Sequence, residues 1–405
     1  MTCQNINPRV PCPLQTFRPF LFAAFGYLFV VQVALCVISV RPALEGHADF
    51  RTFYCAGYLV RTGHGGQIYD YEAQKQAQNA LVAPSDVALP FYHPAYEALI
   101  FVPFSVPTYR VGYFLFAGFN VALLVTSAML IRPYLFGLVS VWRGLPLLLL
   151  LLFFPTGLAL MQGQDSILLL ALYSCAFVAI VAGNDFLAGC LLGLALMKFQ
   201  IALPVAVLFL IWRRWRIITG FVVSGSAVLI ASIWLVGFHG LIAHARFLLG
   251  VSSDLATSGD QLRNGIFPRA MPNLRGMLFS LEGAHLPNIW LQSEIAALSL
   301  LVLWWTARRG KEVTFPGSAF ALTVVCALLV SYHVQVHDLT LLILPIALWL
   351  DRATLKSRAG EGVMTTALPA LFLAQPVYLF LTTHGLLWLL SLPMLALLLL
   401  WPKPD

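Results

Sequence analysis

The sequence predicts an all-α polytopic membrane protein that forms a single integral membrane domain over residues 1–405. Hydrophobic residues make up 60% of the chain, charged residues only 10%, and the mean hydropathy is +0.84. A soluble domain averages about 25% charged residues. The few charges gather in clusters, and the apolar runs between them are ~14–24 residues long, the length that crosses a hydrocarbon core.

These apolar runs predict about twelve transmembrane helices. The two longest polar stretches, 41–92 and 239–286, are expected to form two larger loops. Loop 41–92 contains two helical patterns, Phe50–Val60 and Tyr71–Leu81, which would lie in the membrane interface. The expected spans are 19–40, 93–107, 109–131, 144–161, 165–182, 186–212, 217–238, 287–307, 315–332, 338–351, 363–383 and 386–402.

Basic residues gather in short clusters at 213–216, 308–311 and 352–358. Clusters of this kind mark cytoplasmic loops, so both large loops are expected on the extracytoplasmic face of the cell (inner) membrane. The clusters also explain the net charge of +7 without a nucleic-acid partner, because aromatic residues are interleaved with them only at Trp212 and Trp215.

One part of this predicted topology is inconsistent with the expected position of the site. If loop 41–92 lies outside, crossings by 93–107 and 109–131 return Arg132 to the outside and leave Gln162 inside. One segment in this region is therefore expected to be re-entrant or interfacial. The best candidate is 93–107, which is short and contains three prolines.

The N-terminal segment does not suggest a cleavable signal, and the cysteines do not suggest a cofactor. The N-terminal prolines and the long first apolar run favour a retained first transmembrane helix over a cleavable signal. The seven cysteines lie mostly in apolar segments and show no CxxC or Cys/His spacing. We expect them to pack as small apolar residues, and we expect no cofactor and no metal.

Asp49 is the candidate catalytic residue, because it follows the first span closely and precedes an aromatic-rich helical pattern. A carboxylate in that position could serve as a general base at the membrane surface. The alternative is that Asp49 caps the helix that begins at Phe50. Arg51 and Tyr54, on the same helical pattern, are candidate substrate-binding residues.

Lys198 is the only basic residue between Arg143 and Arg213, and it lies within the 27-residue segment 186–212. A lysine at the bilayer centre costs roughly 3 kcal/mol or more. Two short helices that meet at Lys198 would bring it to the surface, where it could contact a phosphate. The alternative is that Lys198 forms an ion pair with Asp165 or Asp185.

Further polar groups interrupt the apolar pattern at places where chain segments could meet. Gln164 lies in the break MQGQDS, His93 begins the segment after the first loop, and Arg275 lies in the second loop. His337 follows another span and could donate a hydrogen bond to a phosphate. With His333 and Asp338 it also resembles a set of metal ligands, although a complete set of ligands is not evident.

The chemistry that these residues fit is transfer of a sugar from a lipid phosphate. Such a reaction needs a general base for the acceptor hydroxyl, and cations or hydrogen-bond donors for the leaving phosphate. A donor with a long apolar tail would also explain why the chain consists almost entirely of membrane helices. The rival hypothesis is a multi-spanning transporter or lipid flippase, but the inverted repeats common in transporters are not evident.

Taken in order, six stretches resemble glycosyltransferase family 87, a group in the GT-C superfamily of polyprenyl-phosphate-sugar-dependent membrane transferases. They extend over most of the chain, and their order and spacing carry the resemblance. The stretches are DFRTFYCAGYLVRTGHGGQIYD (49–70), YHPAYEALIFVPFSVPTY (92–109), GQDSILLLAL (163–172), LAGCLLGLALMKFQIAL (187–203), MPNLRGML (271–278) and HDLTLLILPIALWL (337–350).

The resemblance implies a GT-C type fold and an inverting transfer at the extracytoplasmic face. A hexose such as mannose, or a pentose, would pass from a polyprenyl-phosphate donor to a lipid or glycan acceptor. It assigns the catalytic carboxylate to Asp49 and a late-loop histidine to His337. The family's Lys-Pro-Gln-like element corresponds to Lys198-Phe199-Gln200, in which Phe199 replaces the usual proline.

Overall fold

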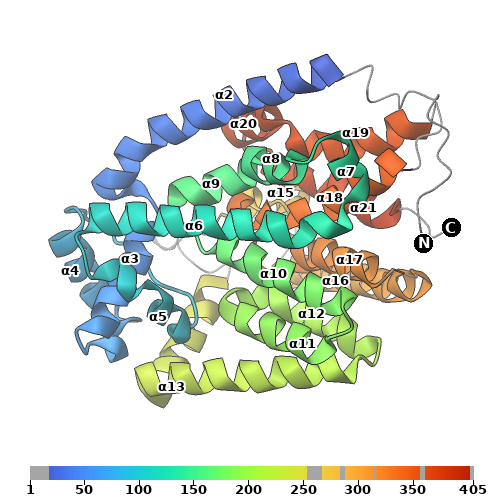
Figure 1. The fold of residues 1–405 in the computed structure, drawn as a ribbon. Helices are drawn as coiled ribbons and strands as arrows, with labels where there is room; N and C mark the ends of the chain where they lie inside the picture. The colour runs from blue at the N-terminus through green and yellow to red at the C-terminus, as the bar shows by residue number, and fades with distance from the viewer. Residues whose placement is uncertain (1–17, 253–266, 283–287, 314, 356–360, 402–405) are drawn as a thin grey trace.

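The computed structural model describes residues 18–252, 267–282, 288–313, 315–355 and 361–401. This part of the chain is helical and contains no β strand (Figure 1). The α-helices are α2 (Arg18–Pro42), α3 (Phe50–Arg61), α4 (Tyr71–Leu81), α5 (Ala98–Phe101), α6 (Tyr109–Ile131), α7 (Phe136–Val141), α8 (Leu145–Leu152), α9 (Phe154–Gln162), α10 (Ser166–Val181), α11 (Asp185–Leu194), α12 (Phe199–Ile211), α13 (Trp215–Ser252), α15 (Leu274–Glu282), α16 (Asn288–Glu312), α17 (Pro316–Val330), α18 (Ile343–Leu355), α19 (Glu361–Leu373), α20 (Gln375–Thr383) and α21 (Ser391–Leu399).

Short turns of tighter or wider helix connect several of these elements. Those that matter most for the site are η6 between α11 and α12, and η8 before α18. The turns are η1 (Ala43–His47, a π-helical turn) and the 3₁₀ turns η2 (Gly65–Gln67), η3 (Ala95–Glu97), η4 (Pro103–Ser105), η5 (Arg132–Tyr134), η6 (Ala195–Lys198), η7 (Pro268–Ala270), η8 (Val336–Leu342) and η9 (Leu387–Leu390).

Several helices are long and apolar enough to cross a membrane, which confirms the predicted class. Five helical runs in the described residues meet this description by length and composition, and the pair α8 and α9, bent by 59°, could form a sixth. One of the five is Asp185–Ile211, which bends back at η6. Other expected spans, such as α10 and α17, are apolar but only 16 and 15 residues long. They are shorter than the ~20 residues that a full crossing usually needs, so the predicted number of twelve spans is not confirmed.

The segment 93–107 does not form a membrane-length helix. It is divided into η3, α5 and η4, and α5 has only four residues. Proline removes a backbone donor and disfavours helical geometry in the preceding residue, and Pro94, Pro103 and Pro107 divide this stretch. The expected span is therefore replaced by short turns that pack against α3, where a Cβ on Gly57 would lie 2.6 Å from the Phe101 backbone.

The two helices expected in the first large loop form at α3 and α4, and α3 lies in an aromatic core. The Phe50 ring stacks on Phe116 with centroids 5.4 Å apart, and the Phe53 ring stacks on Phe101 at 4.5 Å. Rings of this kind contribute stabilising contacts beyond the area they bury. This core fixes the beginning of α3, where Asp49 lies.

The run from α11 to α12 folds back on itself, as the position of Lys198 predicted. Arg214 Nη2 lies 2.6 Å from Asp185 Oδ1, so the two ends of the run meet. A straight helix of 27 residues would separate its ends by about 40 Å. The reversal occurs at η6, where Lys198 has non-helical backbone angles.

Small residues let this hairpin approach α13 closely. A Cβ on Gly189 would lie 2.0 Å from the Ile217 carbonyl oxygen, and one on Gly193 would lie 2.6 Å from the Phe221 carbonyl oxygen. Close backbone approach at small residues is the usual packing of membrane helices. Figure 1 shows α10 and α11 between α6 and α13.

Helix α13 contains a break at Gly237, whose φ of 66° favours glycine. The expected span 217–238 ends at this break, but the helix resumes and continues to Ser252. The second large loop therefore begins with helix, and residues 253–266 of that loop lie outside the described part of the chain.

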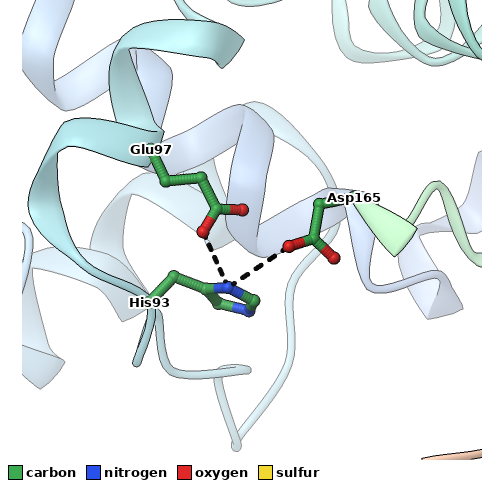
Figure 2. Close-up of side chains that lie close together, drawn as sticks. All are labelled: His93, Glu97 and Asp165. Carbon is green, nitrogen blue, oxygen red and sulfur yellow. Dashed lines mark ion pairs between the residues drawn. The ribbon is translucent and has the colours of Figure 1, made fainter. Parts of the chain in front are cut away.

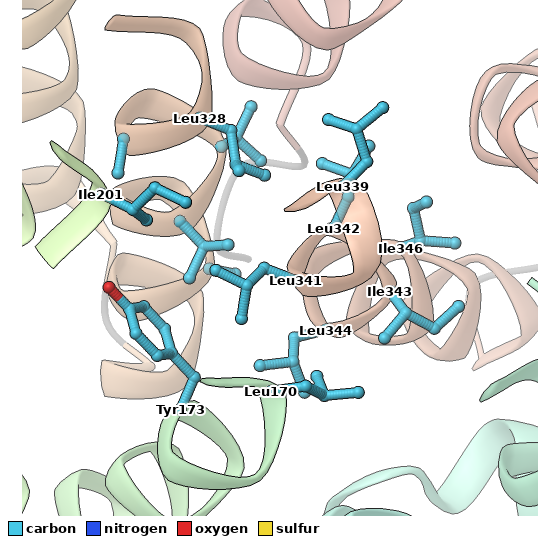
Figure 3. Packing of buried hydrophobic residues seen from close by; sticks show 14 of the residues in the cluster. Leu170, Tyr173, Ile201, Leu328, Leu339, Leu341, Leu342, Ile343, Leu344 and Ile346 are labelled. Atoms are coloured by element: carbon cyan, nitrogen blue, oxygen red, sulfur yellow. The ribbon is translucent and has the colours of Figure 1, made fainter. Parts of the chain in front are cut away.

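The main apolar core lies where α10, α12 and α17 meet η8 and α18. Figure 3 shows Leu170, Tyr173, Ile201 and Leu328 facing the leucines of η8. All of these side chains are almost completely buried. This packing holds η8, and therefore His337 and Asp338 at its start, against the hairpin formed by α11 and α12.

Candidate active site

Asp49 is held by two glutamines from the end of α9. Gln164 Nε2 donates a hydrogen bond of 2.5 Å to Asp49 Oδ2, and the Asp49 backbone N–H donates to Gln162 Oε1 at 3.2 Å. The Asp49 side chain accepts no hydrogen bond from the first turn of α3. Of the two alternatives for Asp49, the capping role is therefore not observed, and the half-buried carboxylate faces the α9–α10 break instead.

Gly163 makes this arrangement possible. It ends α9 with a φ of 61° and a ψ of 44°, a left-handed conformation that favours glycine. A Cβ at this position would also lie 2.6 Å from Phe50 Cβ. Only a residue without a side chain lets the chain turn here, so that Gln162 and Gln164 both reach Asp49.

Lys198 is buried and forms ion pairs with two carboxylates. Its Nζ lies 2.9 Å from Asp165 Oδ1 and 2.5 Å from Asp338 Oδ1, and it donates to Ser166 Oγ at 3.2 Å. The ion-pair alternative is therefore present with Asp165. It is not present with Asp185, which pairs with Arg214 at the far end of the hairpin.

The ion pairs of Lys198 join three breaks in the helical structure. Asp165 lies between α9 and α10, Lys198 ends η6, and Asp338 lies in η8. Asp338 also accepts a hydrogen bond of 2.8 Å from the Gln335 N–H through Oδ2, as part of a capping box. Asp338 thus combines a capping role with a role in the ion-pair network.

His337 lies beside this network, with its Nε2 3.6 Å from Asp338 Oδ1. Burial lowers the pKa of His337 below its usual range, so the imidazole is largely neutral near neutral pH and can donate one hydrogen bond. Burial also lowers the pKa of His333, to about 4. The group with metal-ligand spacing among the described residues does not include these histidines.

His93 belongs to a second buried group, which Figure 2 shows with Glu97 and Asp165. His93 Nδ1 lies 2.9 Å from Glu97 Oε2 and 3.7 Å from Asp165 Oδ2. Burial raises the pKa of Glu97 to about 7. Sequence analysis missed Glu97, although its spacing of four residues from His93 in YHPAYE was a signal that the two side chains could meet.

Arg51 and Tyr54 are not brought to the ion-pair network. Arg51 Nη2 donates to the Ala83 carbonyl oxygen at 2.6 Å, which ties α3 to the end of α4. The Tyr54 hydroxyl donates to the Pro107 carbonyl oxygen at 2.8 Å. In this structure both side chains fix the loop that carries Asp49.

Arg275 contacts the segment that precedes His337. Its Nη1 donates to the Tyr332 carbonyl oxygen at 3.2 Å, and its guanidinium lies 3.8 Å from the centroid of the Tyr332 ring. Asn273 Nδ2 donates to the Ser331 carbonyl oxygen at 2.7 Å. The second-loop motif PNLR therefore positions residues 331 and 332, and through them the approach to η8.

The comparison with protein families decides the class of the protein. The model of glycosyltransferase family 87 matches residues 91–331, more than half of the chain. The chain belongs to glycosyltransferase family 87. The matched region includes His93, Gln164, Lys198 and Arg275 but not Asp49 or His337. A search of curated proteins finds no match.

Membership of family 87 makes this chain a glycosyltransferase, and its several long apolar helices place it in a membrane. An enzyme of this kind fits lipid and glycan substrates. The transporter hypothesis gains no support from the family assignment. The structure brings together five of the predicted site residues, Asp49, Gln164, Lys198, His337 and His93. Two further carboxylates, Asp165 and Asp338, connect them.

We predict that Lys198→Met destabilises the protein by about 3–5 kcal/mol, because removal of one partner leaves buried carboxylates without a counter-charge. The melting temperature of the purified protein measures the effect. Lys311→Met, at an exposed position in α16, is the control and should melt like the wild type.

Adding Asp338→Asn to Lys198→Met should recover part of the lost stability, because it removes one of the two unpaired charges. Equal melting temperatures for Lys198→Met and Lys311→Met would contradict a structural role for the ion pairs.

Proposed function

We propose that this glycosyltransferase moves a hexose or pentose from a polyprenyl-phosphate donor to a hydroxyl of a lipid or glycan acceptor, with inversion at the anomeric carbon. The observation that carries the proposal is the Asp49 carboxylate, held by Gln164 beside the buried network of Lys198. A polar site of this kind within apolar helices suits a donor that joins a charged phosphate to a hydrocarbon tail.

Asp49 is the proposed general base. The acceptor oxygen attacks the anomeric carbon while Asp49 takes its proton, and the bond between this carbon and the phosphate oxygen breaks. The electron pair of that bond leaves with the polyprenyl phosphate. The hydrogen bond from Gln164 fixes the carboxylate in one orientation, and a positioned base is more effective than a mobile one.

His337 is the proposed hydrogen-bond donor to the leaving phosphate. Its neutral imidazole can donate a hydrogen bond to the phosphate, because the neighbouring Asp338 is already ion-paired with Lys198. Because the charge of Lys198 is already compensated by two carboxylates, its proposed contribution is to fix the position of η8 and therefore of His337. The other residues would support substrate binding indirectly. His93 and Gln164 fix the α9–α10 break, Arg275 fixes residues 331 and 332, and Arg51 and Tyr54 fix the loop of Asp49.

The proposed active site faces the extracytoplasmic side of the cell membrane. Since 93–107 forms no membrane-length helix, α6 can carry the chain across and the pair α8 and α9 can bring it back. Gln164 then returns to the side of Asp49, in agreement with their hydrogen bond. This arrangement removes the conflict in the predicted topology and leaves the basic clusters on the opposite side.

Asp49→Asn should fold normally and lose about 10²- to 10⁴-fold in turnover, because it keeps the size of the side chain but removes its basicity. Release of polyprenyl phosphate from the sugar donor measures turnover. Asp70→Asn is the matched control in the same loop. Asp70 caps α4 by accepting from the Ala73 N–H, and asparagine retains that acceptor. Wild-type turnover in folded Asp49→Asn protein would rule out Asp49 as the base.

Cysteine labelling of intact cells tests which side of the membrane the site occupies. In a cysteine-free background, His47→Cys and Tyr332→Cys should react with an impermeant reagent added outside, because both positions are exposed and flank the site. Arg216→Cys and Arg308→Cys, exposed in the basic clusters, should react only after the membrane is opened. Opposite accessibility of positions 47 and 332 would contradict a single site on one face.

A further inference from the structure

Three buried side chains beside the proposed site converge on one point. Figure 2 shows the carboxylates of Glu97 and Asp165 approaching the same nitrogen of His93. The possible ligand atoms all lie within 4.8 Å of one another, and Nδ1 of His93 is 2.9 Å from Glu97 and 3.7 Å from Asp165. Ligand atoms about 2.1 Å from one ion lie roughly 3.0–3.4 Å apart. The two His93 separations lie within about 0.3 Å of this range, so small side-chain shifts would let the three groups share one ion.

Glu97 has a carboxylate oxygen that the protein does not satisfy. The side chain is completely buried, and Oε1 has no hydrogen-bond partner among the described residues. Burial of a carboxylate without full compensation is costly, and such groups in proteins usually pair with a cation or coordinate a metal. The orphan oxygen is therefore an independent indication of a ligand at this point.

The charge of this group also suits a divalent cation. Three buried carboxylates, Glu97, Asp165 and Asp338, are connected through close contacts to a single lysine, Lys198. In the ionisation state that metal ligands require, with the carboxylates charged and His93 neutral, the group carries an excess of two negative charges. Asp165 has one oxygen toward Lys198 and the other toward His93, so it can serve a cation on each side.

We propose that His93, Glu97 and Asp165 bind one divalent metal ion, which the spacing of residues in the sequence did not predict. One imidazole nitrogen and two carboxylates form a ligand set suited to Mn²⁺ or Zn²⁺. A divalent ion would bring the charge of the group to zero. The site lies beside the aromatic core, since the ring centroids of His93 and Phe53 are 4.9 Å apart.

The ion would join the segment after the first loop to the α9–α10 break. Asp165 is the neighbour of Gln164, which holds Asp49. Fixing Asp165 therefore also fixes the residue that orients the proposed base. The three ligands are almost completely buried, so the ion would be structural and its binding does not depend on whether the proposed transfer reaction is correct.

Metal content and thermal stability of the full-length protein test this proposal. Wild-type protein purified in detergent, loaded with MnCl₂ or ZnCl₂ and freed of excess ion should retain about one equivalent per chain by elemental analysis. The same ions should raise its melting temperature at micromolar concentrations, whereas MgCl₂ should have a smaller effect.

Glu97→Gln should weaken binding by at least ~10-fold, because it removes a charged ligand, and should abolish the metal-dependent rise in melting temperature. Glu72→Gln, at an exposed position in α4, is the matched control and should bind like the wild type. If Glu97→Gln does not fold, His93→Gln provides the same comparison, and the shift is measured within each variant.

Two results would overturn the proposal. One is wild-type protein that retains no stoichiometric metal and shows no metal-dependent stabilisation. That result would mean that protons and hydrogen bonds alone balance the group. The other is equal metal binding by the wild type, Glu97→Gln and His93→Gln, which would show that the ion binds elsewhere on the protein.

Discussion

The structure depends on one buried ammonium group. Lys198 lies between Asp165 and Asp338, and these three residues come from three separate breaks in the helical structure. A single charge in an apolar interior is unfavourable, and so is a carboxylate there, but together they compensate one another at short range. The network therefore joins the end of α9, the end of η6 and the start of η8, and each of these places carries a polar residue of the candidate site.

The aromatic core around α3 supplies the second constraint. Phe50 packs against Phe116 on one side and leaves space for Gly163 on the other. The close approach of this glycine brings Gln164 to Asp49. The carboxylate is thus positioned by packing as well as by hydrogen bonding, which suits the proposed role of a base that meets its substrate in one orientation.

Much of this arrangement could be predicted from the sequence, because burying a charge and placing proline within a helix both carry a known free-energy cost. The free-energy cost of placing a charged lysine in the middle of 27 apolar residues predicted a hairpin. The Arg214–Asp185 ion pair confirms this hairpin. The prolines of 93–107 made it the best candidate for a segment that is re-entrant or interfacial, and the structure shows only the short elements η3, α5 and η4 there. The partners of Lys198 could not be chosen from the sequence, because Asp165, Asp185 and Asp338 differ only in their three-dimensional positions. Hydropathy alone also does not fix the number of spans, since it does not distinguish a short buried helix from one that crosses the membrane.

The central claim is that the donor is a polyprenyl-phosphate sugar. Incubation of the purified protein with a panel of such donors and an acceptor extract, followed by mass spectrometry of the lipids, tests it most directly. We expect at least one donor to release polyprenyl monophosphate as sugar appears on an acceptor. Transfer from a nucleotide sugar, with every polyprenyl-phosphate sugar left intact, would contradict the account.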